Sequence, residues 1–193
     1  MRSDLSQISL LKRCNVVDAP IGAVGELKAG EAHFDIEAIF RAHYGRIARV
    51  IARVVRDPAR AEELAVEVFV KLWRNRNAQD GNPEGWLYRV AVRMGLDELR
   101  RQTRRSRYER MVGLVRRSPT PEEICADTQE QERVRFILSV IGPRQAELLF
   151  LRSQGLSYEE LSTALDLNPA SIGTLLSRAQ QTFRKEYHKH YGE

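Results

Sequence analysis

A run of arginines near the middle of the chain has the clearest chemical meaning. Between residues 100 and 117 a single acid, Glu109, accompanies eight arginines, at positions 100, 101, 104, 105, 107, 110, 116 and 117. This segment therefore carries +7, and the remaining residues sum to about −2, because the whole chain carries +5. A guanidinium is planar, always charged and well matched to phosphate oxygens. The run predicts a nucleic-acid surface, with an ordinary solvated helical face as the alternative.

The residue types that perform catalysis or bind metals are not arranged for either task. The four histidines, at positions 33, 43, 188 and 190, lack metal-ligand spacing, and Cys14 and Cys125 stand far apart. The chain has no phosphate-binding glycine loop and no GxSxG motif. We therefore expect a protein that is not an enzyme and needs no cofactor. Its isolated cysteines favour a reducing, cytoplasmic setting, and no apolar run is long enough to predict a membrane span.

Helices are predicted to position the arginines. Apolar residues recur with a helical period over 36–54, 61–73 and 86–94, with Trp73 counted among the core positions of the second helix. Asp35, Asp57-Pro58 and Asn82-Pro83 supply start signals, and a polar loop over 75–82 precedes the third helix. We expect these helices to form a compact bundle, from which the third continues into the arginine run.

The C-terminal part predicts a second helical unit. Pro119 and Pro121 interrupt the pattern, a capping box follows at Thr120 and Glu123, and helical periodicity returns from Val134. The predicted fold class is all-α, with two small helical domains joined by a flexible linker. The boundaries are a tail over 1–32, a first domain over 33–108, a linker over 109–130, a second domain over 131–188 and a short tail over 189–193.

A helix-turn-helix is the most specific pattern in the second unit. Ser157 and Glu160 form a capping box, and a turn over 166–169 leads into a second amphipathic helix. In a helix-turn-helix this second helix enters the major groove with its N-terminal end first. A plain helical hairpin is the alternative. The residues expected to be exposed on the second helix are small and hydroxylated apart from one arginine: Ser171, Gly173, Thr174, Ser177 and Arg178.

Three segments together resemble the bacterial RNA polymerase sigma-70 family, in its small extracytoplasmic-function (ECF) group. Residues 60–73 (RAEELAVEVFVKLW) resemble the polymerase-binding helix of the family, and residues 86–101 (WLYRVAVRMGLDELRR) resemble its promoter −10 helix. Residues 155–161 (GLSYEEL), followed by SRA at 177–179, resemble its −35-binding helix-turn-helix. The resemblance covers about 33–107 and 134–186, and implies a sigma region 2-like bundle and a sigma region 4-like domain.

The resemblance implies a transcription initiation factor that binds core RNA polymerase and promoter DNA, double-stranded at −35 and melted at −10. It also implies an anti-sigma protein as a candidate partner, because many members of the group are held by one. The residues implied for core-polymerase binding are Glu62, Glu63, Val66, Glu67 and Phe69. Those implied for −10 DNA are Trp86, Tyr88, Arg89, Arg93, Asp97, Arg100, Arg101, Arg104 and Arg105. Those implied for −35 DNA are Ser157, Tyr158, Asn168, Ser171, Thr174, Ser177 and Arg178.

The residue chemistry of the −10 segment agrees with that role. Unstacked bases rest on aromatic side chains beside cations that hold the backbone, and Trp86 and Tyr88 supply aromatics next to the arginines. An ordinary core tryptophan is the alternative for Trp86. By analogy with the family, the loop over 75–85 would hold the flipped base. The acids of the 60–73 segment have a solvated face as their alternative.

Several positions depart from the pattern of the family. Val66 stands where the family usually has glutamine, and Arg93 stands where it has asparagine. Gly173 and Leu175 occupy recognition-helix positions that are usually basic, so we expect weaker and less salt-dependent −35 binding. These departures keep a second hypothesis open: a sigma-like helix-turn-helix regulator or decoy that binds DNA or a partner without initiating transcription.

Overall fold

The computed structural model describes residues 34–113 and 126–192, and every regular element in these two ranges is a helix, which confirms the all-α prediction. None of these helices is long and apolar enough to cross a membrane. In chain order the helices of the described ranges are α2 (Ile36–Val55), α3 (Pro58–Trp73), α4 (Arg76–Asp80), α5 (Pro83–Met111), α6 (Ala126–Val140), α7 (Pro143–Ser153), α8 (Tyr158–Leu165) and α9 (Pro169–Tyr191).

The helices begin at the predicted start signals. The side chain of Asp35 accepts hydrogen bonds from the first-turn amides of α2, and Asp57 and Asn82 do the same for α3 and α5. Ser157 and Glu160 form the predicted capping box at the start of α8. Such caps satisfy amides that have no partner within the helix. Proline occupies the first position of α3, α5, α7 and α9, where a missing amide hydrogen costs nothing.

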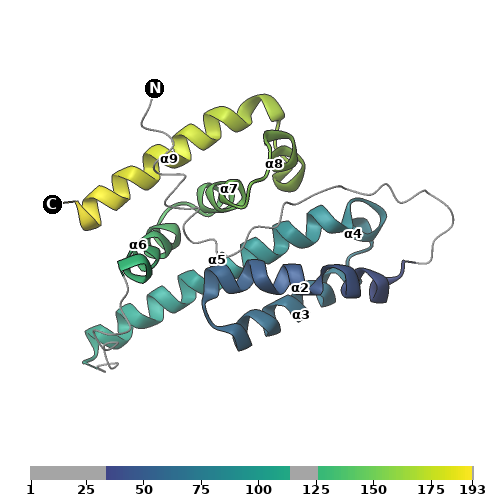
Figure 1. Ribbon diagram of the computed structural model, residues 1–193, viewed down its shortest axis with the longest axis horizontal. Helices are drawn as coiled ribbons and strands as arrows, with labels where there is room; N and C mark the ends of the chain where they lie inside the picture. Colours follow the sequence, from purple (N-terminus) through teal and green to yellow (C-terminus); the bar gives the residue numbers. More distant parts are fainter. Residues whose placement is uncertain (1–33, 114–125, 193) are drawn as a thin grey trace.

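Helices α2, α3 and α5 form one layer, in which each packs against the other two (Figure 1). Its centre is fully buried and aliphatic, as the periodicity predicts. An alanine-sized group at Gly95 of α5 would lie 3.5 Å from Val54 of α2, so the small residue lets these two helices approach closely. The largest fully buried side chains in this layer are Ile47, Ile51, Leu72, Leu87 and Leu96.

Helices α6 to α9 form a second layer above the first, in which α6, α7 and α8 contact α5 and α9 packs on the outside of α6, α7 and α8 (Figure 1). The helix-turn-helix is present as predicted: α8 ends at Leu165, and α9 begins at Pro169. The predicted apolar positions of α9, which are Ile172, Leu176, Ala179 and Phe183, are buried.

The predicted loops differ from the structure in two places. The polar segment over 75–82 contains α4, because Asn75 caps a short helix by accepting from the amide of Ala78. Within the segment predicted as a linker, α5 continues to Met111 and α6 already begins at Ala126. The predicted tail over 1–32, the two-proline break and the capping box at Thr120 and Glu123 lie outside the described residues.

Candidate nucleic-acid interface

The long helix α5 carries most of the residues predicted to bind −10 DNA. Residues 89, 93, 97, 100 and 104 are spaced by three or four positions and therefore share one face of α5. On this face Arg93 donates through Nε to the carboxylate of Glu147 on α7, at 3.1 Å. Arg100 is only 12% exposed at its side chain and pairs with Asp97 at 2.8 Å. Part of the predicted −10 face is thus engaged within the protein.

The neighbouring face of α5 is more open. Arg101 pairs with the buried Glu98, and Arg105 pairs with Glu109, both at 2.8 Å. Arg104 is exposed. The guanidinium groups of Arg101 and Arg105 are themselves exposed, and Glu98 also accepts from Arg60 at 3.3 Å, so Glu98 keeps a cationic partner when Arg101 binds a phosphate instead. The open face therefore suits the phosphate backbone of a nucleic acid.

Trp86 and Tyr88 lie in the first turns of α5, and each is half-buried against the core. Arg46 of α2 approaches the Tyr88 ring, with its guanidinium carbon 5.8 Å from the ring centre. The Tyr88 hydroxyl is buried and finds no hydrogen-bond partner among the described residues. Burial, opposed by nearby arginines, raises the pKa of Tyr88 to about 12. The phenol is therefore neutral at physiological pH.

The segment between α3 and α5 is held in shape by its own polar side chains. The amide nitrogen of Gln79 donates to the carbonyls of Leu72 and Trp73, at 3.0 and 2.7 Å, and so caps the end of α3. Asn82 in turn accepts from the amide of Gly85 at the start of α5. The segment that the family resemblance connects with a flipped base is therefore an ordered connection in which α4 lies.

The helix-turn-helix presents its predicted residues in two ways. Ser157 and Asn168 use their side chains to cap α8 and α9. Tyr158 lies at the start of α8, with Arg152 5.4 Å from its ring centre, and Gly173 of α9 lies beneath its edge. The remaining predicted residues, Ser171, Thr174, Ser177 and Arg178, are exposed on α9.

Packing accounts for two departures from the family pattern. Leu175 is half-buried and packs against the core. A β-carbon at Gly173 would be 3.7 Å from the Tyr158 ring, which is ordinary contact, so a longer side chain here would have to pass Tyr158. These two positions contribute to the joining of α8 and α9.

The outward face of α3 carries three of the exposed large apolar residues: Val66, Val70 and Trp73. Their spacing of four and three residues places them in one strip, and Glu62, Glu63 and Glu67 are exposed beside it. Trp73 was expected in the core but is 62% exposed, so that prediction is wrong. The strip could have been found from the sequence, because residues 66, 70 and 73 form a second apolar stripe behind the one that faces the core.

Phe69, unlike Trp73, is buried although a surface role is implied for it. It was implied as a polymerase-binding residue, but it is 3% exposed and packs edge-on against Phe40, with ring centres 4.8 Å apart. Its position on α3 is turned toward α2, so its contribution is to the core.

Sequence reasoning also missed a ridge of arginines on α2. Residues 46, 49 and 53 follow each other at three- and four-residue spacing and therefore lie along one side of the helix, and Arg56 follows as its left-handed C-cap. Burial, together with the nearby Arg49, lowers the pKa of Arg53. The regular spacing was the available signal, but it was hidden among the apolar positions of the same helix.

The geometry defines a helical protein with a cationic helix, a helix-turn-helix and a separate apolar strip. Residues 39–105 match the family model for sigma-70 region 2. Over 165 residues the chain is 30% identical to the ECF RNA polymerase sigma factor SigK of Mycolicibacterium vanbaalenii, a match that covers 80% of this chain and 84% of the relative. The chain belongs to the ECF RNA polymerase sigma factors.

Two further similar proteins match different shares of their own length. The chain is 28% identical over 165 residues to the ECF RNA polymerase sigma factor SigE of Mycolicibacterium smegmatis. That match covers 81% of this chain but 63% of the relative, which is less than two thirds of its length. A solved structure of the sigma factor RpoE in complex with the anti-sigma factor NepR, from Bartonella quintana, matches with a TM-score of 0.45 and 18% identity, over 80% of this chain and 97% of that one.

Proposed function

We propose that this chain directs transcription initiation by binding core RNA polymerase through α3 and promoter DNA through α5 and α9. The observation that carries the proposal is the separation of two surfaces with different chemistry. An apolar strip with an acidic border lies on α3, and α5 is a strongly cationic helix. One surface suits a protein partner and the other suits phosphates, so a single chain can bring DNA to a polymerase.

The α3 strip supplies the proposed polymerase contact. Val66, Val70 and Trp73 expose apolar surface that has no other occupant among the described residues, and large aromatic side chains dominate the energy of many protein interfaces. The bordering glutamates Glu62, Glu63 and Glu67 would steer a basic partner into register. Val66 fits this surface as an apolar contact, without the hydrogen bond that a glutamine would make.

The two DNA-facing helices supply different parts of promoter recognition. The open arginines of α5 would hold the backbone at −10, where Trp86 and Tyr88 provide aromatic faces for unpaired bases. Ser171, Thr174, Ser177 and Arg178 of α9 would approach the major groove at −35. Residues 33–108 and 131–188 would thus act as separate promoter-reading parts joined by residues 109–130.

The proposal places the chain in the cytoplasm, where its polymerase would be, with no catalytic step of its own. An anti-sigma protein is a further proposed partner, supported by family membership. The same membership supports core RNA polymerase as the primary partner. The competing function, DNA binding without initiation, would leave the α3 strip without a role in polymerase binding.

A charge placed in the strip tests the polymerase contact. We expect Val66→Asp to weaken binding to core polymerase about tenfold or more, because an acid would be buried there without a partner. Val140→Asp is the matched control, since Val140 is 44% exposed and Val66 is 45% exposed. Binding would be followed by fluorescence anisotropy of the labelled full chain. Equal affinity for the two variants and the unchanged chain would contradict docking through α3.

A further inference from the structure

A second group of exposed apolar residues lies at the C-terminal end of α5, away from the strip on α3. Tyr108 is 61% exposed, Met111 is 77% exposed and Val112 is 53% exposed. The contacts proposed for polymerase and for DNA use none of the three. Single exposed apolar residues are ordinary on a protein surface, whereas a cluster within five positions is typical of a contact surface.

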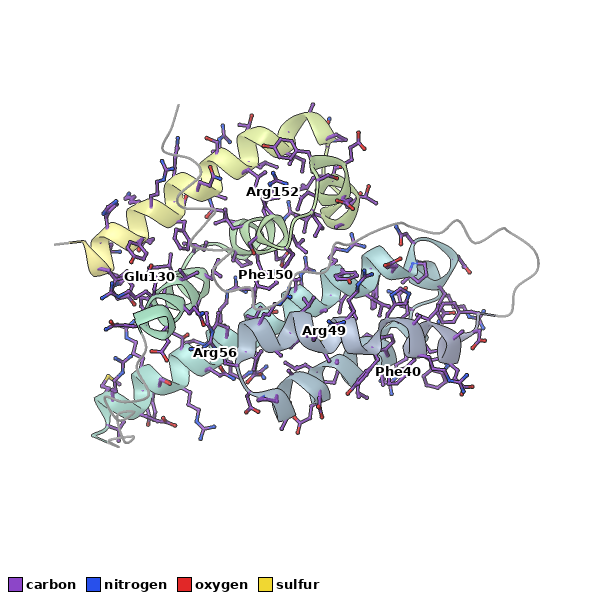
Figure 2. All side chains as sticks on the ribbon, in the orientation of Figure 1. Phe40, Arg49, Arg56, Glu130, Phe150 and Arg152 are labelled. Atoms are coloured by element: carbon purple, nitrogen blue, oxygen red, sulfur yellow. The ribbon has the colours of Figure 1, made fainter. Side chains whose placement is uncertain are left out.

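This end of α5 extends beyond the core that holds the rest of the helix. Leu99 is the last buried residue of α5, and the helix continues to Met111, about three turns further. Figure 1 shows these turns extending past α2 and α3, and Figure 2 shows side chains there standing clear of those two helices. The amide of Val112 still donates to the carbonyl of Tyr108, at 3.0 Å. The projecting turns are therefore a regular scaffold with an open surface.

Tyr108 stands among the open arginines of α5. Side chains three and four positions apart on a helix are neighbours, so Arg104 and Arg105 lie one turn before Tyr108 on the same side. Arg104 is exposed, and the side chain of Arg105 is 73% exposed. Between residues 100 and 111 six arginines accompany one acid. The aromatic ring thus stands in a strongly cationic setting, which favours an anionic partner.

Tyr108 also lies on the same side of α5 as Trp86. The two residues are separated by about six turns, or about 33 Å along the helix axis. Arg93 and Arg104 lie on this side between them, and the side chain of Arg93 is 58% exposed. At the 3.4 Å spacing of stacked nucleotides, this length corresponds to about ten nucleotides of one strand. An aromatic residue at each end with arginines between is the arrangement in which a single strand stacks its bases while its phosphates meet cations.

We propose that Tyr108 is a second base-stacking site at the C-terminal end of the α5 DNA face, so that one single strand of DNA runs from Trp86 to Tyr108. The phenol ring stacks on a base, Arg104 and Arg105 contact the neighbouring phosphates, and Met111 extends the apolar surface beside the ring. A protein partner here would bury guanidinium groups, whereas a strand neutralises them. The site rests on the proposed function, because it extends the same DNA-binding face.

Three substitutions at Tyr108 in the full chain test stacking. Tyr108→Ala removes the ring, Tyr108→Phe removes only the hydroxyl, and Tyr108→Trp enlarges the ring. Each changes an exposed residue near a helix end, so the fold should persist, and circular dichroism and thermal melting check this. Val140→Ala is the control, since Val140 is 44% exposed on α6, outside the proposed DNA contacts.

Fluorescence anisotropy with labelled single-stranded DNA of two lengths measures binding. A strand of about 12 nucleotides reaches both aromatic ends of α5, whereas one of about 4 nucleotides reaches a single end. We expect Tyr108→Ala to weaken binding of the longer strand about fivefold to a hundredfold, as for the loss of one stacked base. The shorter strand should lose at most about twofold, because the site at Trp86 remains. Tyr108→Phe, Tyr108→Trp and Val140→Ala should bind both strands as the unchanged chain does.

Photocrosslinking locates the strand on α5. A 5-bromouracil at one end of the longer strand should crosslink to Tyr108, and one at the other end should crosslink to Trp86. Mass spectrometry of the crosslinked peptides identifies the residue in each case. Crosslinks from both ends to Trp86 alone would contradict a strand that spans the helix.

Four binding results would overturn the proposal. The unchanged chain could fail to bind the longer strand, Tyr108→Ala could bind it equally well, Tyr108→Phe could lose as much affinity as Tyr108→Ala, or both strand lengths could lose equally. Weaker binding of Tyr108→Ala to core polymerase, with unchanged affinity for DNA, would assign this end of α5 to a protein instead.

Core-dependent transcription, measured in parallel, separates this inference from the proposed function. A chain whose strand binding depends on Tyr108 but which never initiates with core polymerase would contradict the proposed function and leave the stacking site supported. A chain that initiates normally, with strand binding unaffected by Tyr108→Ala, would support the proposed function and overturn the stacking site.

Discussion

The two helices proposed to face DNA differ sharply in charge. Helix α5 carries eight arginines, whereas the N-terminal half of α9, which is the part expected to enter a groove, carries Arg178 as its one basic residue. Phosphate contacts supply affinity and salt dependence, whereas close approach to base edges supplies positioning and sequence reading. Affinity for DNA should therefore come from α5, and α9 should contribute mainly shape.

The two helices also differ in the contacts that their side chains make within the protein. The arginines of α5 are paired with acids one turn away, as in Arg101 with Glu98 and Arg105 with Glu109. The exposed side chains of α9 are short, and its order comes from the buried positions that pack on α7 and α8. Binding by α5 therefore exchanges ion partners, whereas binding by α9 requires little rearrangement.

The largest expected effect comes from removing exposed charge on α5. Changing Arg101, Arg104 and Arg105 together to alanine should weaken DNA binding strongly and lower the slope of log K against log salt by about 2 to 3, at about 0.7 to 0.9 for each phosphate contact. The slope is measured by titrating labelled promoter DNA at several salt concentrations. An unchanged slope would show that these arginines do not contact phosphates.

A smaller effect is expected from the aromatic platform on α5. Trp86→Ala should weaken binding to melted −10 DNA by about 1 to 3 kcal/mol, because a stacked base loses its surface, while duplex binding stays nearly constant. Forked and fully paired promoter fragments provide the comparison. Because Trp86 is also half-buried, thermal melting accompanies the assay. A loss of folding stability with equal weakening on both fragments would favour the core role.

The effect on α9 should be smaller and of a different kind. Arg178→Ala should lower the salt slope by about 0.9 on duplex −35 DNA, as expected for one lost phosphate contact. Thr174→Ala, at a neighbouring exposed position, should weaken binding without altering the slope. Identical slopes for the unchanged chain and Arg178→Ala would show that Arg178 does not contact a phosphate.

The smallest effect concerns the buried phenol near the start of α5. Burial raises the pKa of Tyr88 to about 12, above the value of 10.0 that is ordinary for a tyrosine. The unfolded chain therefore loses this proton before the folded chain does, so the stabilising contribution is complete below pH 10 and is lost between about pH 10 and 12. Tyr88→Phe should reduce this alkaline loss of stability, as measured by urea unfolding at pH 8 and at pH 11. An equal loss with and without the hydroxyl would contradict this origin.

The sequence predicted the helices well because their start signals act locally. Asp35, Asp57 and Asn82 each cap a helix through amides within three residues, and proline excludes a helix interior regardless of the tertiary context. The helix-turn-helix was predicted for the same reason, since the capping box at Ser157 and Glu160 is contained in four residues.

The failures arise where the outcome depends on a partner far away in the chain. The apolar pattern placed Trp73 in the core, and the family resemblance implied Phe69 for a polymerase contact, although packing against α2 decides which side of α3 is covered. Glu147 is 3% exposed, and the free-energy cost of burying its carboxylate is offset by Arg93, 54 positions earlier. The contact between α7 and α5 could not be predicted from periodicity, because each layer has a complete helical pattern of its own.

Promoter-dependent initiation is the measurement that distinguishes a sigma factor from a regulator or decoy. The purified full chain would be added to core bacterial RNA polymerase on genomic fragments that include its own upstream region, and transcript starts would be mapped. The account predicts a stable complex and specific starts that disappear with Val66→Asp and persist with Val140→Asp. A folded chain that binds DNA but neither joins core polymerase nor yields a specific start would contradict the account and establish the regulator or decoy in its place.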